Sequence, residues 1–255
     1  MRKSYPSDLT DQQWLFIEHL FPQSTRGRPK TVPSREIVNA ILYVMKNGCA
    51  WRALPHDFPV WQTVFIQRLR WARNGVLTRL QELLITQIVP TTCIIDSTFI
   101  ESSYGGGAAA PSGYKRATGH SIHVLLDKTQ HPLQVTVLPA NVHDAHGARV
   151  CIPVAKKQHP SLTHVLGDKA YRQKPLYADI LQVGVVLDGD SPPLPKGVIF
   201  VPMPLRWRVE QFFSWLVKWR RVAKNWCFTQ YGFSLDVAWS LCGLVLTRRL
   251  KALAK

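Results

Sequence analysis

The spacing of hydrophobic and polar positions along the chain changes near residue 90. Upstream of that point the apolar residues recur three and four positions apart, which predicts helices over about 8–21, 34–48 and 60–84. Gly48 follows the last apolar position of the second helix and predicts its C-terminal end. Gly75 predicts an interruption in the third helix. Residues 1–88 are therefore predicted to form an all-helical domain.

Downstream, short runs rich in β-branched residues predict strands at 93–100, 121–127, 132–140, 164–168 and 198–202. Helical spacing returns between and after them, at 145–158, 174–184, 206–221 and 234–253. Three strands in series, followed by alternating helices and strands, are typical of an α/β domain with a mixed sheet. Residues 89–255 are therefore predicted to form one such domain.

The charge of the chain narrows its class of partner. The chain has 255 residues, a formal net charge of +16 and an isoelectric point near 10.0. Such an excess of positive charge favours a polyanion as partner, either nucleic acid or an anionic membrane. We find no apolar run of about 18 residues and no signal peptide, which argues against the membrane. The five cysteines are widely spaced, which indicates reduced, buried thiols in a cytoplasmic protein.

Three of the sixteen acidic residues stand in unusual places. Asp96 lies inside an apolar strand, Asp168 ends another, and Glu210 lies on a basic helix. A carboxylate in a buried strand is costly unless it is paired or binds a cation. Taken singly, Asp96 could cap a turn, Asp168 could start a helix and Glu210 could pair with Arg206 or Arg221. Together, three acids from distant segments match the ligands of a two-metal site for phosphodiester chemistry.

The helix predicted at 206–221 has two faces. At about 100° per residue, one face carries the acid and mostly polar or basic neighbours: Arg206, Glu210, Ser214, Val217 and Arg221. The opposite face is apolar and aromatic, with Val209, Phe212, Trp215, Leu216 and Trp219. This pattern predicts that the aromatic face anchors the helix while Glu210 and the basic residues stay accessible to a metal and to phosphates.

The segments around these acids, DSTFI, GDKAY and RWRVEQFFSWLVKWRRVAKNW, resemble the three acidic motifs of the DDE transposases of bacterial insertion sequences. The similarity is to the insertion-sequence-five-like group. The N-terminal segments LTDQQWLFIEHLFP, RGRP, ILYVMKNGCAWRALP and FPVWQTVFIQRLRW resemble that group's helical domain, and ANVHDAH resembles its segment after the third strand. The resemblance covers nearly the whole chain in order. It implies an RNase H-like catalytic domain preceded by a helix-turn-helix-like domain.

The resemblance also implies a site and its partners. Asp96, Asp168 and Glu210 would be the catalytic acids and would hold two Mg²⁺ ions, for which Mn²⁺ can substitute. Arg206 matches the basic residue four positions before the glutamate, Lys218 a basic position after it, and Arg221 is a further candidate for phosphate binding. The implied activity is cleavage of DNA at the terminal inverted repeats and strand transfer to target DNA. Two DNA ends imply a homodimer or larger assembly on double-stranded DNA, in the bacterial nucleoid.

Other segments offer candidates for DNA contact. Arg26, Arg28 and Lys30 form a basic, proline-containing segment suited to a minor groove, or else a solvated loop. Residues 34–73 could form a helix-turn-helix-like unit whose DNA-facing candidates are Trp51, Arg52, Gln62, Gln67, Arg68 and Arg70. The helix from Val60 to Leu84 could equally be core. His123, His143 and Lys169 are candidates for the rim of the site, and the H-x-x-H pairs His120/His123 and His143/His146 offer a weaker zinc hypothesis.

Two alternatives stay open from the sequence. A decayed transposase copy would bind the repeats without catalysis. A metal-dependent nuclease would cut DNA without strand transfer.

Overall fold

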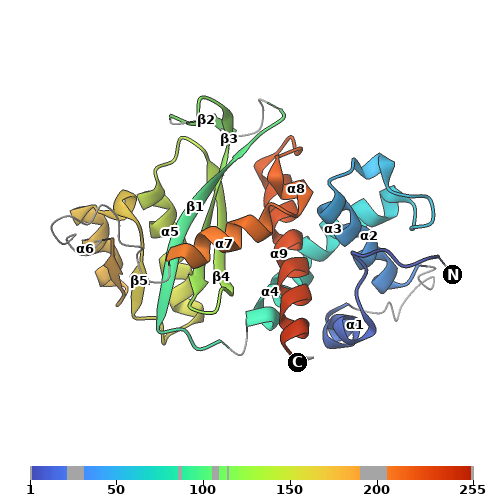
Figure 1. The fold of residues 1–255 in the computed structure, drawn as a ribbon, viewed down its shortest axis with the longest axis horizontal. Coiled ribbons are helices and arrows are strands. Elements are labelled where there is room, and N and C mark those ends of the chain that lie inside the picture. The colour runs from blue at the N-terminus through green and yellow to red at the C-terminus, as the bar shows by residue number, and fades with distance from the viewer. Residues whose placement is uncertain are drawn as a thin grey trace. The chain divides into compact units, whose positions relative to one another are not determined.

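A computed structural model describes residues 2–21, 32–85, 88–104, 109–113, 115–189 and 206–253, the last range without the side chains of 206 and 249–253. The chain forms two compact units (Figure 1). The helical unit comprises residues 1–86, 216–223 and 235–255, and the sheet unit comprises residues 87–215 and 224–234. The strand predicted at 198–202 and the basic segment with Arg26, Arg28 and Lys30 lie outside the described residues.

The N-terminal part of the helical unit follows the predicted helices closely. Its elements are α1 (Asp11–Ile17), η1 (Glu18–Leu20), α2 (Ser34–Asn47), η2 (Trp51–Ala53), α3 (Trp61–Arg73) and α4 (Val76–Ile85). Thr10 starts α1 through a capping box, in which its hydroxyl accepts from the Gln13 N–H at 3.2 Å. Gly48 ends α2 with φ of 73°, and Gly75 separates α3 from α4 with φ of 71°. Both residues occupy the left-handed region that glycine adopts without strain.

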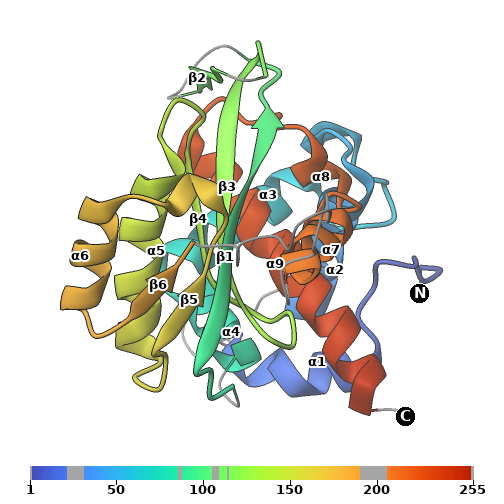
Figure 2. The same ribbon diagram turned by 60° about the vertical axis from the view of Figure 1, so that its left-hand side comes forward.

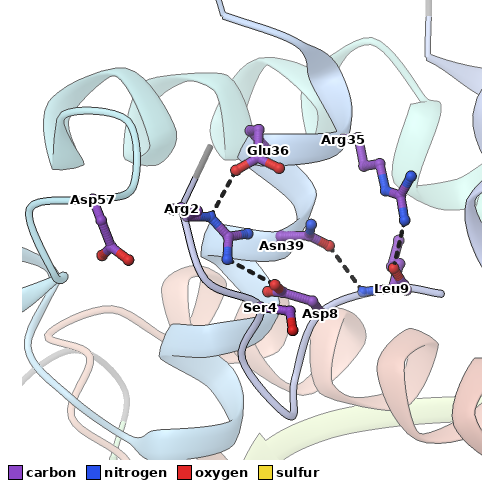
Figure 3. A pocket seen from close by; sticks show the side chains of 8 residues that line it. All are labelled: Arg2, Ser4, Asp8, Leu9, Arg35, Glu36, Asn39 and Asp57. Carbon is purple, nitrogen blue, oxygen red and sulfur yellow. Dashed lines mark hydrogen bonds and ion pairs between the residues drawn. The ribbon is translucent and has the colours of Figure 1, made fainter. Parts of the chain in front are cut away.

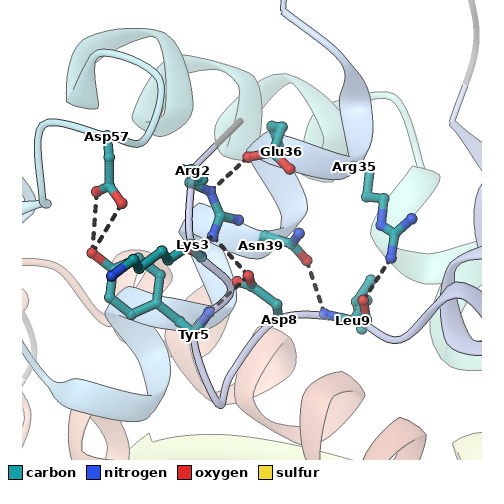
Figure 4. Close-up of polar contacts among 9 residues, drawn as sticks. All are labelled: Arg2, Lys3, Tyr5, Asp8, Leu9, Arg35, Glu36, Asn39 and Asp57. Carbon is teal, nitrogen blue, oxygen red and sulfur yellow. Dashed lines mark hydrogen bonds and ion pairs between the residues drawn. The ribbon is translucent and has the colours of Figure 1, made fainter.

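The N-terminal arm is held on α2 by a polar network (Figure 3). Arg2 donates to Asp8 at 2.7 Å and to Glu36 at 2.8 Å, and its guanidinium lies 4.2 Å from the Phe58 ring centroid. Tyr5 stacks on the same ring at 5.1 Å, and its hydroxyl lies 3.1 Å from the carboxylate of Asp57 (Figure 4). The shallow pocket between these groups is lined by internally paired charges, so we assign it a structural role.

Two C-terminal helices complete the helical unit, namely α8 (Arg220–Ala223) and α9 (Gln230–Leu253), of which residues 235 onward belong here. A side chain at Gly243 would meet Trp219 at 2.1 Å, so α9 passes directly against that ring. The rings of Trp71 and Trp239 also meet, with 6.1 Å between centroids. The predicted single domain from 89 to 255 differs from this division because α9 packs on N-terminal helices, as in the contact between Trp71 and Trp239.

A buried ionic cluster fixes α3 to α9 within the helical unit. Asp236 accepts from Arg68 and, at 2.8 Å, from Arg221. Its exposed fraction is 0%, against 2% for Arg68 and 7% for Arg221. The Arg68 guanidinium also lies 4.9 Å from the Trp51 ring centroid. The polar residues of this cluster are therefore part of the core of the unit.

The sheet unit contains the mixed sheet that the sequence predicts. In the described residues, six strands are β1 (Thr92–Glu101), β2 (Ala110–Pro111), β3 (Thr118–Asp127), β4 (Pro132–Pro139), β5 (His164–Leu166) and β6 (Val186–Asp188). The order is β2-β3-β1-β5-β6, with β4 also paired to β3. The β1–β3 and β3–β4 pairs are antiparallel, whereas β1–β5 and β5–β6 are parallel.

Helices cover both faces of this sheet. Helices α5 (Asp144–Gln158) and α6 (Lys174–Gln182) lie on one face, and α7 (Arg206–Leu216) lies on the other (Figure 2). Cys93 and Ile95 of β1 join the core cluster formed with α5 and α6. Because strand residues alternate between faces, Ile94 and Asp96 point to the α7 side. This alternation decides which chemical groups can meet on each face.

No helix among the described residues is long and apolar enough to cross a membrane. All five cysteines are free, as predicted, although only Cys93, Cys151 and Cys242 are fully buried.

Candidate active site

Asp96 lies within β1, and Asp168 follows the end of the neighbouring strand β5. In the parallel β1–β5 ladder, Ile94 pairs with Leu166. Asp96 and Asp168 each follow two residues later, so both continue on the face of their preceding strand partner. That face is the one covered by α7, because Ile95 and Val165 belong to the cluster on the other face. The sheet therefore brings together two carboxylates that are 72 positions apart in the sequence.

The second acid is fixed by its own turn. Asp168 is the N-cap of the short helix η3 (Lys169–Tyr171), and its carboxylate accepts from the Ala170 N–H at 2.8 Å. A side chain at Gly167 would meet the ring of Tyr171 at 2.8 Å. The GDKAY motif thus needs glycine for close packing, aspartate for the cap and tyrosine for the core. Asp96 similarly accepts from the Ser97 N–H at 2.8 Å.

Glu210 occupies the helix that covers this face. Its side chain is exposed, while Val209 and Phe212 are 0% and 1% exposed, which is the facing predicted for these three residues. Gln130, in the β3–β4 turn, anchors α7 by donating to the Arg208 carbonyl and to Gln211, both at 2.9 Å. The helix ends at Leu216, whereas the sequence predicted that it would continue to residue 221.

The donor set fits a hard divalent cation in part. Carboxylate oxygens are the ligands that Mg²⁺ prefers, and Asp96 and Asp168 present them on one face. Among the described residues, however, no group of three or more His, Cys, Asp or Glu side chains is close enough to share a metal ion. The structure thus brings the two aspartates together and places Glu210 on the covering helix without gathering all three carboxylates into one cluster.

A second polar layer lies behind the aspartates, on the α5 side of the sheet. Ser97 follows Asp96 and therefore points to the opposite face, where its hydroxyl donates to Asp144 at 2.6 Å. His123 is the β3 partner of Ser97, and its Nδ1 lies 3.8 Å from the same carboxylate. Asp144 lies in the first turn of α5, where a negative charge is favoured by the helix dipole.

Burial dominates the electrostatics of this layer. The Tyr171 side chain is 0% exposed, and its hydroxyl has no hydrogen-bond partner among the described residues. Burial raises the pKa of Tyr171 well above 10, and the carboxylates of Asp144, Asp96 and Asp168 raise it further. The phenol therefore stays neutral beneath all three acids. Desolvation lowers the pKa of His123, which the Asp144 carboxylate opposes.

Sequence reasoning overlooked Ser97, Asp144 and Tyr171. The HD pair at 143–144 was visible in the segment after the third strand. Its acid was missed because only the fold brings α5 beside β1. His143 caps α5 by accepting from the Ala145 N–H at 3.1 Å, and Gln173 lies 3.4 Å from the same ring nitrogen.

The predicted rim residues separate into two kinds. His143 and Lys169 are exposed, as a rim requires, and they remain candidates. His123 is wrong as a rim residue because it is 0% exposed and packs against Gly147, where a side chain would meet its ring at 2.2 Å. Zinc binding by the histidine pairs gains no support, since no metal-binding group of three side chains occurs among the described residues.

The predicted DNA contacts also separate by burial. Arg68 and Arg221 are wrong as phosphate ligands because both are buried on Asp236. Arg52, Arg70 and Lys218 are exposed and stay predictions. The side chain of Arg206, with Arg26, Arg28 and Lys30, lies outside the described residues.

Comparison with protein families shows the family to which the chain belongs. Residues 88–230, more than half of the chain, match the family described as the transposase DDE domain, so the chain belongs to the DDE transposases. Residues 9–81 match a family described as a transposase of the IS4/5 family (DUF4096). The family and the fold class predicted from the sequence, a mixed sheet flanked by helices with a helical region before it, are both confirmed.

Two relatives match part of the chain. An uncharacterized protein y4sN of Sinorhizobium fredii is 30% identical over 108 residues, which are 41% of this chain and 86% of that protein. An insertion element IS402 uncharacterized 16.2 kDa protein of Burkholderia cepacia is 36% identical over 87 residues, covering 31% of this chain and 59% of the relative.

Two solved structures show weaker similarity. The Mos1 transposase paired-end complex with the left transposon end aligns with 93% of this chain and 68% of its own, at 11% identity and a TM-score of 0.34. A simian T-cell lymphotropic virus intasome in complex with the PP2A regulatory subunit B56 gamma aligns with 58% of this chain and 48% of its own, at 14% identity and a TM-score of 0.38.

Proposed function

We propose that this chain binds the terminal inverted repeats of its insertion sequence, cleaves DNA there and joins the freed end to target DNA. The observation that carries the proposal is that Asp96 and Asp168 each come two residues after a paired position, Ile94 and Leu166, of the parallel strands β1 and β5. Helix α7, which carries Glu210, covers one face of that sheet (Figure 2). Membership of the DDE transposases supports DNA transposition as the general function.

Asp96, Asp168 and Glu210 would hold the metal ions, with Glu210 approaching the aspartates as DNA binds. Two Mg²⁺ ions, or Mn²⁺ in their place, would supply Lewis-acid stabilisation of the attacking and leaving oxygens. The protein's part is to fix the carboxylates. The Ser97 and Ala170 N–H groups donate to the carboxylates of Asp96 and Asp168 at 2.8 Å, and these hydrogen bonds fix the orientation of both side chains.

The two chemical steps balance without an external energy source. In cleavage, a water oxygen attacks phosphorus and loses a proton to solvent. The bond from phosphorus to the 3′-oxygen breaks, and that oxygen takes up a proton, which leaves a 3′-hydroxyl and a 5′-phosphate. In joining, that 3′-hydroxyl loses its proton, attacks a target phosphate and displaces another 3′-oxygen, which takes up a proton in turn. One phosphodiester bond forms as one breaks, so no covalent protein–DNA intermediate is needed.

Basic residues would position the DNA. Lys169 follows Asp168 directly and is exposed, so it can reach a phosphate near the cleaved bond. We further propose phosphate contacts by Arg206 and Lys218, and repeat recognition by the helical unit through Arg26, Arg28, Lys30, Arg52 and Arg70. Two DNA ends would be held by a homodimer or a larger assembly.

The decisive experiment measures nicking of DNA that carries the repeat found beside the gene, with Mg²⁺. Glu210→Gln and Asp96→Asn should reduce the rate by roughly 10³-fold or more, because the acids act as one set. Both variants should still shift the DNA in a gel. Asp179→Asn is the matched control, since Asp179 is an exposed acid of the same unit, paired with Arg149 at 2.7 Å. Without DNA, Mn²⁺ titration by electron paramagnetic resonance should show weaker binding in Asp96→Asn than in Glu210→Gln or Asp179→Asn.

The outcomes separate the proposal from its alternatives. Equal inactivity of wild type and Glu210→Gln, with DNA binding intact, would identify a decayed copy. Nicked products that never join target DNA would identify a nuclease. Wild-type nicking that Glu210→Gln leaves unchanged would contradict the assignment of the third acid.

A further inference from the structure

A short segment after α8 is fixed to the end of β1 by backbone hydrogen bonds. The Asn225 N–H donates to the Glu101 carbonyl at 2.9 Å, and the Ser103 N–H donates to the Asn225 carbonyl at 2.8 Å. The Asn225 side chain is 0% exposed, accepts from the Cys227 N–H at 2.7 Å and lies 3.2 Å from His120. This segment is therefore a built part of the sheet unit and not a loosely attached loop.

The anchored segment presents aromatic rings to solvent. Trp226 is 45% exposed and Phe228 is 69% exposed, on either side of the half-buried Cys227. Tyr231, at the start of α9, is 52% exposed. A single exposed ring needs no explanation, but several exposed rings on a rigidly held segment mark a binding surface.

Positive charge lies beside these rings. Lys224 lies 5.9 Å from the Trp226 ring centroid and pairs with Glu101 at 3.3 Å. Two further cations, Lys115 and Arg116, are exposed just before β3, whose residue Gly119 pairs with Glu101. We call Trp226 and Phe228, with these three cations, the aromatic tip. Aromatic rings interleaved with cations are typical of surfaces that stack unpaired bases and grip their phosphates.

The distance from the aspartates sets where such bases would lie. Glu101 is five residues beyond Asp96 on the continuous strand β1, which corresponds to about 17 Å at the usual rise of a strand. That length equals about five base pairs of B-DNA.

We propose that the aromatic tip stacks on unpaired bases of transposon-end DNA about five base pairs from the phosphate held at Asp96. In an intact duplex the faces of the bases are already stacked, so Trp226 and Phe228 can engage only bases that are flipped or frayed. The surface would therefore hold DNA in a locally opened form. This inference rests on the proposed function, because it requires DNA at the aspartates.

The test uses 2-aminopurine, placed at one position after another in repeat-end DNA, with full-length Glu210→Gln protein so that binding is seen without cleavage. Wild-type tip residues should change the fluorescence at positions roughly four to six base pairs from the cleavage site. Trp226→Ala should abolish that change and weaken binding about 5- to 150-fold, the range for one stacked base. Trp226→Phe should keep most of the fluorescence change and most of the binding that Trp226→Ala loses.

Leu181→Ala is the matched control, because Leu181 is 62% exposed on α6 of the same unit and lies outside the tip. It should leave both readouts unchanged. Lys224→Ala should weaken binding with a smaller salt dependence, as expected for one lost phosphate contact.

The proposal is overturned if no 2-aminopurine position responds, or if Leu181→Ala and Trp226→Ala act alike. It is also overturned if Trp226→Ala dissociates a DNA-free oligomer in sedimentation while the fluorescence stays unchanged, since the surface would then bind a second copy. Failure of the proposed function shows separately, as nicking that does not depend on Glu210.

Discussion

Replacing Asp236 by asparagine should destabilise the helical unit strongly. Asp236 accepts from Arg68 and Arg221 with no solvent exposure of its own. Asparagine keeps the shape but removes the charge and turns an N–H₂ group toward a guanidinium. Two buried cations would then lose the counter-charge of Asp236, which costs about 3–5 kcal/mol. That loss is a large share of the roughly 5–15 kcal/mol by which a domain is stable.

The size of the effect depends on how the second positive charge is accommodated. The Arg68 guanidinium lies 4.9 Å from the Trp51 centroid and 5.3 Å from that of Phe65. Such contacts offset part of the charge, by about 0.5–2 kcal/mol each. Asp236→Asn should therefore fall toward the lower end of the range.

The assay is urea unfolding of the intact protein, with hydrogen exchange across residues 235–246 to localise the loss in α9. Asp11→Asn serves as the control, because Asp11 also pairs with an arginine, Arg35, at 2.7 Å but is 94% exposed. The free energy of unfolding of Asp11→Asn should equal that of the wild type within the scatter of the measurement. An Asp236→Asn protein within about 0.5 kcal/mol of wild type would refute the reasoning. The apolar triple variant Arg68→Met, Arg221→Met, Asp236→Leu should be much closer to wild type than Asp236→Asn.

Three further predictions concern the sheet unit. Ser97→Ala and Asp144→Ala remove the same hydrogen bond, so each should cost about 1–3 kcal/mol, and a double-mutant cycle in urea should show non-additivity; simple addition would contradict the pairing. Burial lowers the pKa of His123 below its ordinary 6.5, so the unfolded state binds a proton that the folded state refuses, and stability should fall as the pH drops below 6.5. His123→Gln should flatten that pH dependence, and an unchanged slope would contradict it. Burial raises the pKa of Cys151 to about 11, so at pH 8 iodoacetamide should label the half-buried Cys227 first by mass spectrometry; equal rates would contradict the burial of Cys151.

The periodicity of the sequence predicted those helices and strands that local sequence features determine. The strand expected at 93–100 is observed as Thr92–Glu101, and the break expected at Gly75 is present. Strand β6 (Val186–Asp188) was missed because its three residues carry no alternation of their own and are strands only by pairing with β5. The end of α7 at Leu216 was missed because the amphipathic pattern continues through Trp219 and Arg221, although the backbone does not.

Charge was the least reliable guide to exposure. Arg68 and Arg221 look like DNA contacts because arginine is usually at the surface, and their partner Asp236 lies 168 positions from Arg68. A sequence pattern has no signal for such a pairing. The same limit hid Asp144, whose role as the acceptor of Ser97 depends on α5 starting beside β1.

The three predicted acids differ in how firmly the fold places them. Asp96 and Asp168 each follow a paired position of the β1–β5 ladder by two residues, and each carboxylate accepts from a nearby backbone N–H, of Ser97 and Ala170 respectively. Glu210 depends on tertiary packing of a helix, for which Gln130 supplies the described anchor to the β3–β4 turn. Loss of that anchor in Gln130→Ala should therefore weaken catalysis more than it weakens metal binding at the aspartates. Equal losses in both, measured by nicking and by Mn²⁺ titration, would show that the turn supports the whole sheet rather than the position of α7.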